Sequence, residues 1–133
     1  MVSRQDFDSN LILVQDIMTK AIISVNTETT IFQVAKMMEQ AGIGAVLVKK
    51  DGHLSGIITD RDYATKIMAN NVSSDTSVEK IMSSPLITIN HNESISAAAE
   101  RMTNKKIRKL AETDNGKIIG LITSTDLVTQ LTK

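Results

Sequence analysis

The chain is an internal repeat. Residues 14–62 align without a gap with residues 78–126 at a constant offset of 64 residues. Apolar core packing alone would repeat only the apolar positions, but here glycine, threonine and aspartate positions repeat as well. The repeated pattern Gly-x-x-Thr-x-x-Asp therefore predicts two related sites that face each other across a pseudo-twofold axis. Matched pairs include Ile17 and Ile81, Asn26 and Asn90, Gly56 and Gly120, Thr59 and Thr123, and Asp62 and Asp126.

Each copy is too short to hold a good core of its own. A half of about 55 residues buries too little surface, so we expect the two halves to share one core. The predicted organisation is an amino-terminal segment at 1–13, a first repeat at 14–69, a polar linker at 70–77 and a second repeat at 78–133.

The order of predicted elements in each copy is β-α-β-β-α. In the first copy a β-branched strand at Ile22–Val25 precedes a helix with a capping box at Thr30 and Gln33, and Gly42 ends that helix. Strands at 45–48 and 54–59 flank an Asp-Gly hairpin turn, and a further helix begins at Asp60. The second copy has the same pattern, with Ile95, Ala98, Ala99 and Met102 as the predicted buried face of its first helix.

Composition excludes several function classes. The formal net charge is zero, which gives no general attraction to nucleic acid or anionic membrane. No apolar run is long enough to span a bilayer, and the first ten residues are too polar for a secretory signal. The chain has no cysteine and two histidines, so no zinc site, disulfide or obligatory cofactor is expected, and the predicted location is cytoplasmic. No nucleophile with a base and an orienting group emerges, so we do not expect an enzyme.

The repeat unit resembles the CBS (cystathionine β-synthase) domain, and the two copies resemble the tandem CBS pair known as the Bateman module. The stretches "IMTKAIISV", "AGIGAVLVKKDGHLSGIITDRD" and "NGKIIGLITSTDL" carry the resemblance, in order and at the usual spacing, over roughly residues 11 to 131. It implies an α+β fold in which the two sheets pack together with the helices outside. It also implies a stand-alone sensor module, with no appended catalytic or DNA-binding domain, that binds an adenosyl compound such as AMP, ADP or ATP.

The resemblance implies two unequal ligand clefts. In the family the aspartate typically holds the ribose and the threonine lies beside the phosphate. We expect the first cleft to hold a phosphorylated nucleotide, because Arg108 and Lys109 can neutralise phosphate. The mirror cleft lacks a cation at the matching positions, so we expect it to be weaker, to be empty, or to use Lys20. The first cleft is predicted to contain Ile57, Thr59, Arg61, Asp62, Leu86, Ile87, Arg108 and Lys109, and the second Lys20, Ile22, Ile23, Gly44, Ala45, Leu121, Thr123 and Asp126.

Two observations leave alternatives open. Thr-x-x-Asp at a helix start is also close to a capping box, which needs no ligand. Glu112 falls where Val48 stands in the first copy, and burying an unpaired carboxylate costs several kcal/mol. We therefore expect either that its strand lies at an exposed edge or that Glu112 pairs with Lys109 or Arg101.

Two functions remain. The first is a nucleotide sensor without catalysis that acts on a separate, unidentified partner protein. The second is a ligand-free scaffold with the same fold, favoured by Glu112 and by the uncharged second cleft. The resemblance also implies a homodimer, for which Met37, Met38, Ile67 and Met68 are candidate surface residues. Membrane and nucleic acid are not expected as partners.

Overall fold

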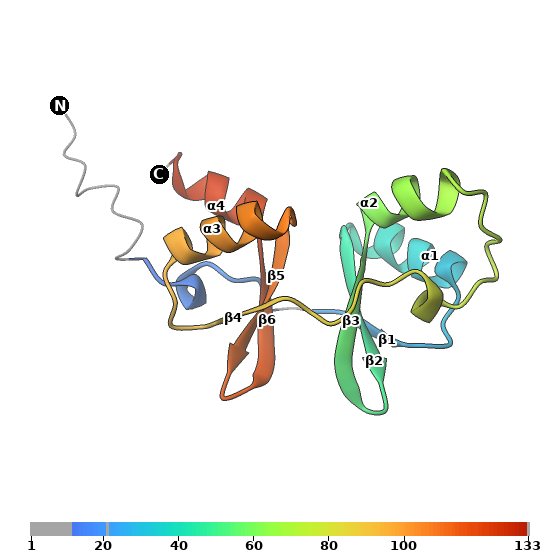
Figure 1. Ribbon diagram of the computed structural model, residues 1–133, viewed down its shortest axis with the longest axis horizontal. Coiled ribbons are helices and arrows are strands. Elements are labelled where there is room, and N and C mark those ends of the chain that lie inside the picture. The colour runs from blue at the N-terminus through green and yellow to red at the C-terminus, as the bar shows by residue number, and fades with distance from the viewer. Residues whose placement is uncertain (1–11, 21, 133) are drawn as a thin grey trace. The chain divides into compact units, whose positions relative to one another are not determined.

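The structure is a computed structural model that describes residues 12–20 and 22–132. These residues form two three-stranded sheets with helices, which confirms the predicted α+β fold (Figure 1). In each sheet the middle strand pairs in parallel with the first strand and antiparallel with the third. The first sheet contains β1 (Ser24–Asn26), β2 (Ala45–Lys50) and β3 (His53–Thr59), and the second contains β4 (Thr88–Asn90), β5 (Lys109–Asp114) and β6 (Lys117–Thr123).

The helices follow the predicted order in both copies. The first copy has α1 (Ile31–Ala41) and then α2 (Asp60–Asp62), which continues as the π-helix η3 (Tyr63–Met68). The second copy has α3 (Ile95–Lys105) and α4 (Ser124–Gln130). Each copy begins with a short 3₁₀ helix, η2 (Val14–Asp16) or η4 (Val78–Lys80).

The boundaries of α1 follow from local chemistry. The Thr30 hydroxyl accepts from the backbone N–H of Gln33 at 3.1 Å, and the Gln33 side chain accepts from the N–H of Thr30 at 3.0 Å. These two bonds satisfy amides that the first helical turn leaves unpaired. The helix ends at Gly42, whose φ of 66° is the left-handed conformation that glycine adopts without steric cost. The predicted capping box and C-cap are therefore confirmed.

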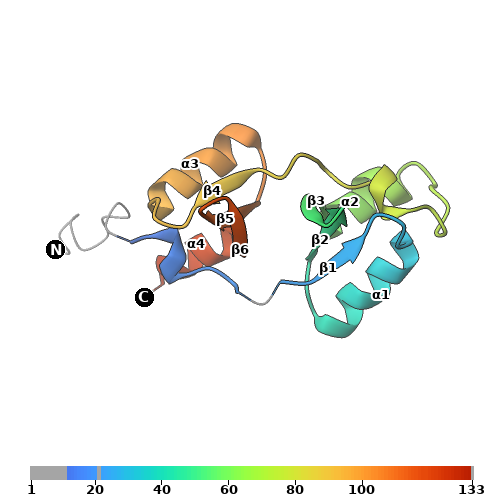
Figure 2. The same cartoon turned by 90° about the horizontal axis from the view of Figure 1, so that it is seen from below.

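The chain divides into two compact units, and each unit borrows a segment from the other copy. Unit 2 is Ile22–Leu86, and unit 1 combines the described residues 12–20 with residues 87–132. Isolated bridges attach η2 to unit 1 through Thr19 and Leu121, and attach η4 to unit 2 through Ser83 and Ile57. Figure 2 accordingly shows η2, in blue, among the elements of unit 1, which include α3, β4 and α4. Each compact unit thus contains the leading segment of one copy and the remainder of the other copy.

Each unit has its own apolar core between its sheet and its helices. Unit 2 buries Ile31, Val34, Met38, Val46, Val48, Ile58, Ile67 and Val78, and unit 1 buries Val14, Ile89, Ile95, Ala98, Met102, Leu110 and Ile122. Three expectations are wrong. The predicted single shared core is instead two cores, each of which includes one residue, Val78 or Val14, from the leading segment of the other copy. Ala99 is exposed, because its position on α3 turns away from the sheet. Met38 and Ile67 belong to the core of unit 2 and therefore present no dimer surface, whereas Met68 is 77% exposed.

No helix in the described part of the chain is both long and apolar enough to cross a bilayer.

Candidate functional site

The Thr-x-x-Asp pattern of unit 2 lies where β3 ends and α2 begins. The backbone N–H of Thr59 donates to Asp62 Oδ2 at 2.8 Å, and the Thr59 hydroxyl is 3.3 Å from the same oxygen. Asp62 is buried, with 8% of its surface exposed. The geometry is that of a helix cap, so the capping interpretation of this motif is confirmed for Asp62.

A lysine one turn later engages the other oxygen of Asp62. Lys66 Nζ lies 3.2 Å from Asp62 Oδ1. The same ammonium donates to the carbonyl of Ile81 at 3.1 Å and to the Ser83 hydroxyl at 3.1 Å. An ammonium group has three N–H donors, and here each has an acceptor. Both oxygens of Asp62 and all three protons of Lys66 are therefore used inside unit 2.

The equivalent motif of unit 1 shares the bond from threonine N–H to aspartate, but its threonine hydroxyl also caps an amide, and it lacks the lysine. The N–H of Thr123 donates to Asp126 Oδ2 at 2.8 Å, and the N–H of Asp126 donates to the Thr123 hydroxyl at 3.1 Å. The residue 64 positions after Lys66 is Gln130. Among the described residues, Oδ1 of Asp126 has no hydrogen-bond or ion-pair partner.

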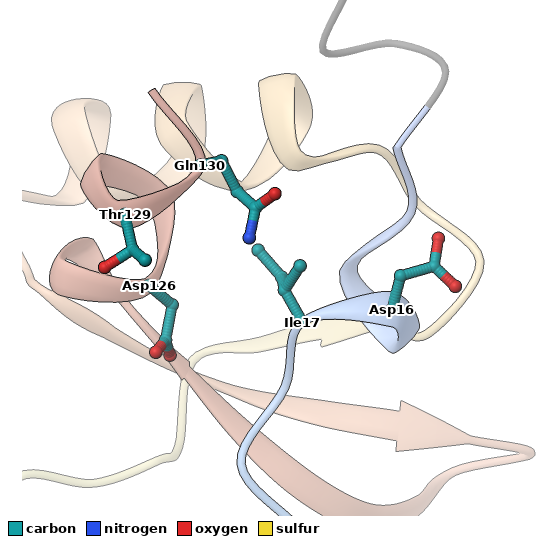
Figure 3. Close-up of a pocket in the computed structure, with 5 residues that line it drawn as sticks. All are labelled: Asp16, Ile17, Asp126, Thr129 and Gln130. Atoms are coloured by element: carbon teal, nitrogen blue, oxygen red, sulfur yellow. The ribbon is translucent and has the colours of Figure 1, made fainter. Parts of the chain in front are cut away.

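Beside Asp126 lies a pocket of about 210 Å³. We call it the acidic pocket, because its lining includes two carboxylates and no cation. Figure 3 shows three of its residues on α4, with the Gln130 side chain extending toward Ile17. The lining residues are Asp16, Ile17, Asp126, Thr129 and Gln130.

Glu112 lies in the core of unit 1 and overturns both expectations for it. Its strand β5 is the middle strand of the sheet, not an edge, and Glu112 is 0% exposed. Neither carboxylate oxygen has a hydrogen-bond partner. Arg101 pairs instead with Glu93, at 2.9 Å, and no ion pair joins Lys109 to Glu112 in the described residues. Burial, and then the negative charge of Asp126, raise the pKa of Glu112 to about 7.

The residues predicted for each cleft are divided between the two units. From the first predicted cleft, Leu86 belongs to unit 2 with the capped motif, while Ile87, Arg108 and Lys109 belong to unit 1. From the second, Lys20 belongs to unit 1 with Leu121, Thr123 and Asp126, while Ile22, Ile23, Gly44 and Ala45 belong to unit 2.

Within a unit, the structure brings together residues that the sequence had assigned to different clefts. In unit 2, Ala45 is the strand partner of Thr59, and the N–H of Asp60 donates to the carbonyl of Gly44 at 3.0 Å. In unit 1, Lys109 is the strand partner of Thr123. Sheet pairing therefore places Lys109 at the start of α4. The carbonyl of Arg108 lies there too, because it accepts from the N–H of Ser124 at 2.8 Å.

The difference between Gly44 and Arg108 has a steric reason. A Cβ on Gly44 would lie 2.9 Å from Asp60 Oδ2, so the exposed Asp60 side chain would have to move to admit a side chain there. In unit 1 the residue facing this position is Ser124, which is smaller than Asp60, and Arg108 is accommodated with its side chain exposed. Arg61 is also exposed, and its N–H donates to Asp60 Oδ1 at 2.8 Å.

Sequence reasoning missed Lys66, Gln130, Asp16 and Ile17. The signal was available in the offset of 64 residues, which aligns Lys66 with Gln130 and Lys80 with Asp16. At these positions the two copies differ in charge, so residues that repeat between the copies do not reveal them.

Comparison with known proteins gives a consistent family. The model of the CBS domain matches residues 14–69 and 78–133. The CBS domain-containing protein YhcV of Bacillus subtilis is 34% identical over 114 residues, which cover 86% of this chain and 81% of YhcV. The chain spans 60% and 62% of two other curated relatives.

Solved structures share the fold. An uncharacterised conserved protein from Pyrococcus horikoshii has a TM-score of 0.88 at 26% identity, over 95% of this chain and 96% of that one. The CBS domain pair of protein MJ0100, solved in complex with 5′-methylthioadenosine and S-adenosyl-L-methionine, has a TM-score of 0.80 at 29% identity, over 90% of this chain and 95% of that pair.

Proposed function

Since the chain belongs to the CBS-domain family and carries two CBS domains, we propose that it is a regulatory module that binds an adenine nucleotide, AMP, ADP or ATP. The observation that carries the proposal is the likeness, over 90% of the chain, to a CBS pair solved with two adenosyl compounds bound. The module changes the activity of a separate protein through ligand binding, and it has no catalytic activity of its own.

The proposal assigns the ribose and phosphate contacts to the two capped motifs. Thr59 and Asp62 serve a first ligand, for which Arg108 and Lys109 supply positive charge. Thr123 and Asp126 serve a second, weaker site. Arg108 is exposed, as a phosphate contact requires, and it stands where unit 2 has only Gly44.

A cytoplasmic location and a homodimer are further parts of the proposal. The absence of cysteine from the sequence supports the location. Exposed apolar side chains on the helices and at the end of α4 support self-association, namely Phe32 at 57%, Met68 at 77%, Val128 at 59% and Leu131 at 72%.

A specific observation favours a second candidate, a ligand-free scaffold. Both oxygens of Asp62 already have partners within unit 2, so the motif is complete without a ribose. Under this alternative the capped motif only stabilises the junction between β3 and α2.

Thermal unfolding with AMP, ADP, ATP or S-adenosylmethionine separates the two candidates. A ligand at about 100 times its dissociation constant adds roughly 2.7 kcal/mol to the free energy of unfolding, which raises Tm by several degrees. We expect a nucleotide to raise Tm, and we expect Asp62→Ala and Arg108→Ala to remove the rise while Asp126→Ala retains it. Each variant is compared with its own Tm without ligand.

Lys105→Ala is the matched control for Arg108→Ala, because it removes an exposed cation at the end of α3. A nucleotide response that is lost equally in Lys105→Ala would reflect general electrostatics. No response to any nucleotide or to S-adenosylmethionine would favour the scaffold.

A further inference from the structure

The acidic pocket of unit 1 is lined by Gln130, the counterpart of Lys66 in unit 2. The offset of 64 residues relates Asp62 to Asp126, Ile81 to Ile17 and Ser83 to Thr19. The exchange of leading segments preserves this relation, because Thr19 bridges Leu121 as Ser83 bridges Ile57. Unit 1 therefore repeats the framework that surrounds Lys66 Nζ.

The three acceptors of that framework have no donors in unit 1. In unit 2 the carboxylate, the carbonyl and the hydroxyl all lie within 3.2 Å of Lys66 Nζ. Their counterparts are Asp126 Oδ1, the carbonyl of Ile17 and the Thr19 hydroxyl, and none of them has a hydrogen-bond partner among the described residues. Gln130, which replaces Lys66, lines the pocket without filling it.

The charges of unit 1 have changed in the direction that favours a bound cation. Lys66 is replaced by neutral Gln130, and Lys80 is replaced by Asp16. Asp16 and Asp126 both line the pocket. Glu112, fully buried and without a partner, adds a further acid close enough to Asp126 for their charges to interact. Asp16 is exposed and its Oδ2 accepts from the N–H of Leu13 at 3.1 Å, so it adds charge near the pocket but is not unpaired. Asp126 is half-buried and has one oxygen without a partner among the described residues, which is costly, and a cation offsets that cost.

The donor set suits an ammonium better than a metal ion. No group of three or more His, Cys, Asp or Glu side chains in the described residues could hold a metal. One carboxylate oxygen, one carbonyl and one hydroxyl match the three N–H donors of a primary ammonium, as Lys66 demonstrates in unit 2. The volume of about 210 Å³ accommodates an ammonium with a short carbon chain attached.

We propose that the acidic pocket binds the primary ammonium group of a small amine, at the position that Lys66 Nζ occupies in unit 2. The amine nitrogen donates to Asp126 Oδ1, to the carbonyl of Ile17 and to the Thr19 hydroxyl. This proposal does not rest on nucleotide binding, although it shares Asp126 with the second proposed nucleotide site.

The test uses 1,4-diaminobutane as the probe and thermal unfolding of the full chain as the readout. We expect the amine to raise the Tm of the wild type. Gln130→Lys restores the internal ammonium, so we expect this variant to have a higher Tm without ligand and no further rise with the amine. The reciprocal variant Lys66→Gln opens the equivalent place in unit 2, and we expect it to lower the Tm while the amine response is retained.

Two controls make the test specific. Tetramethylammonium carries the charge of one protonated amine of the probe but has no N–H donors, so we expect no rise in Tm beyond that caused by sodium chloride at equal ionic strength. Ammonium chloride distinguishes a free ammonium ion from an amine with a carbon chain. Equal shifts with tetramethylammonium, no shift with 1,4-diaminobutane in the wild type, or an unchanged amine response in Gln130→Lys would each overturn the proposal. Nucleotide titrations of the same variants keep its failure separate from that of the nucleotide site.

Discussion

The two units share the same arrangement of strands and helices but differ in their charged residues. Each has a capped Thr-x-x-Asp motif between a strand and a helix, but unit 2 completes it with Lys66 and unit 1 does not. Unit 2 also places Val48 in its core, where unit 1 places Glu112. The backbone of a repeat therefore tolerates a change of core chemistry, and the unit with unsatisfied acids is the one that gains from binding a cation.

The largest expected effect comes from giving unit 2 the core acid of unit 1. Val48 is fully buried and has no cation in its core cluster. In Val48→Glu, an unpaired carboxylate replaces a packed side chain, and we expect the free energy of unfolding to fall by about 3 to 5 kcal/mol at pH 8. Urea denaturation measures the change. Val48→Leu controls for altered shape, and a loss below about 1 kcal/mol in Val48→Glu would show that this core position tolerates a charge.

The second prediction concerns the pH dependence of unit 1. The pKa of Glu112 is about 7 in the folded chain, against an ordinary value of 4.5. At a pH between these two pKa values, Glu112 keeps its proton in the folded chain and has released it in the unfolded chain. The contribution of Glu112 to the free energy of unfolding should therefore be fully present below pH 4.5 and be lost as the pH rises to about 7. The total loss is roughly 3 kcal/mol.

A series of urea denaturations from pH 4 to pH 8 tests this slope. Glu112→Gln keeps the shape and cannot titrate, so the difference between the wild type and this variant isolates the contribution of Glu112. The interpretation of Glu112 as a buried acid fails if the two proteins show the same pH dependence.

Third, the two capping aspartates should differ in their contributions to stability. Asp62→Ala removes a cap and leaves the Lys66 ammonium without its carboxylate, so we expect a loss of about 2 kcal/mol. Asp126→Ala removes a cap but breaks no ion pair, and it relieves the repulsion between Asp126 and Glu112. We therefore expect a loss of about 1 kcal/mol or less. Chemical denaturation at pH 7 ranks the two variants, and the opposite order would contradict the comparison.

The smallest expected effect is the loss of the Lys66 ion pair itself. Lys66→Gln makes unit 2 resemble unit 1 at this position, but the lysine side chain is 40% exposed and solvent screens the pair. We expect a loss of about 1 kcal/mol, measured as a shift of the urea midpoint. Lys36→Gln is the matched control, because its pair with Glu39 is more exposed and should contribute less. If Lys36→Gln lowers stability as much as Lys66→Gln does, the bonds from Lys66 to Ile81 and Ser83 contribute nothing to stability.

Local chemistry was sufficient to predict the elements. The capping box at Thr30 and Gln33 and the Gly42 C-cap depend on residues a few positions apart, and the structure confirms both. Both hairpin turns have positive φ at the two central residues, 52° and 81° at Asp51 and Gly52, and 52° and 78° at Asn115 and Gly116. Such turns are determined by the residues within them.

The partners of charged groups could not be predicted in the same way. Glu112 was expected to find a cation in Arg101 or Lys109, but Arg101 pairs with Glu93 and Glu112 has no partner. Several cations lay within reach along the sequence, and only the packing of α3 against the sheet determines which acid each one meets.

The sequence by itself determined the repeat, the family, the order of elements and the positions of the two capped motifs, because these follow from periodicity and from contacts within a few residues. Only the tertiary structure decided that the leading segment of each copy joins the unit of the other copy. That exchange brings Ile81 and Ser83 to Lys66, and it brings Ile17 beside Asp126. The acidic pocket depends on these contacts between residues more than 100 positions apart, which no local pattern encodes.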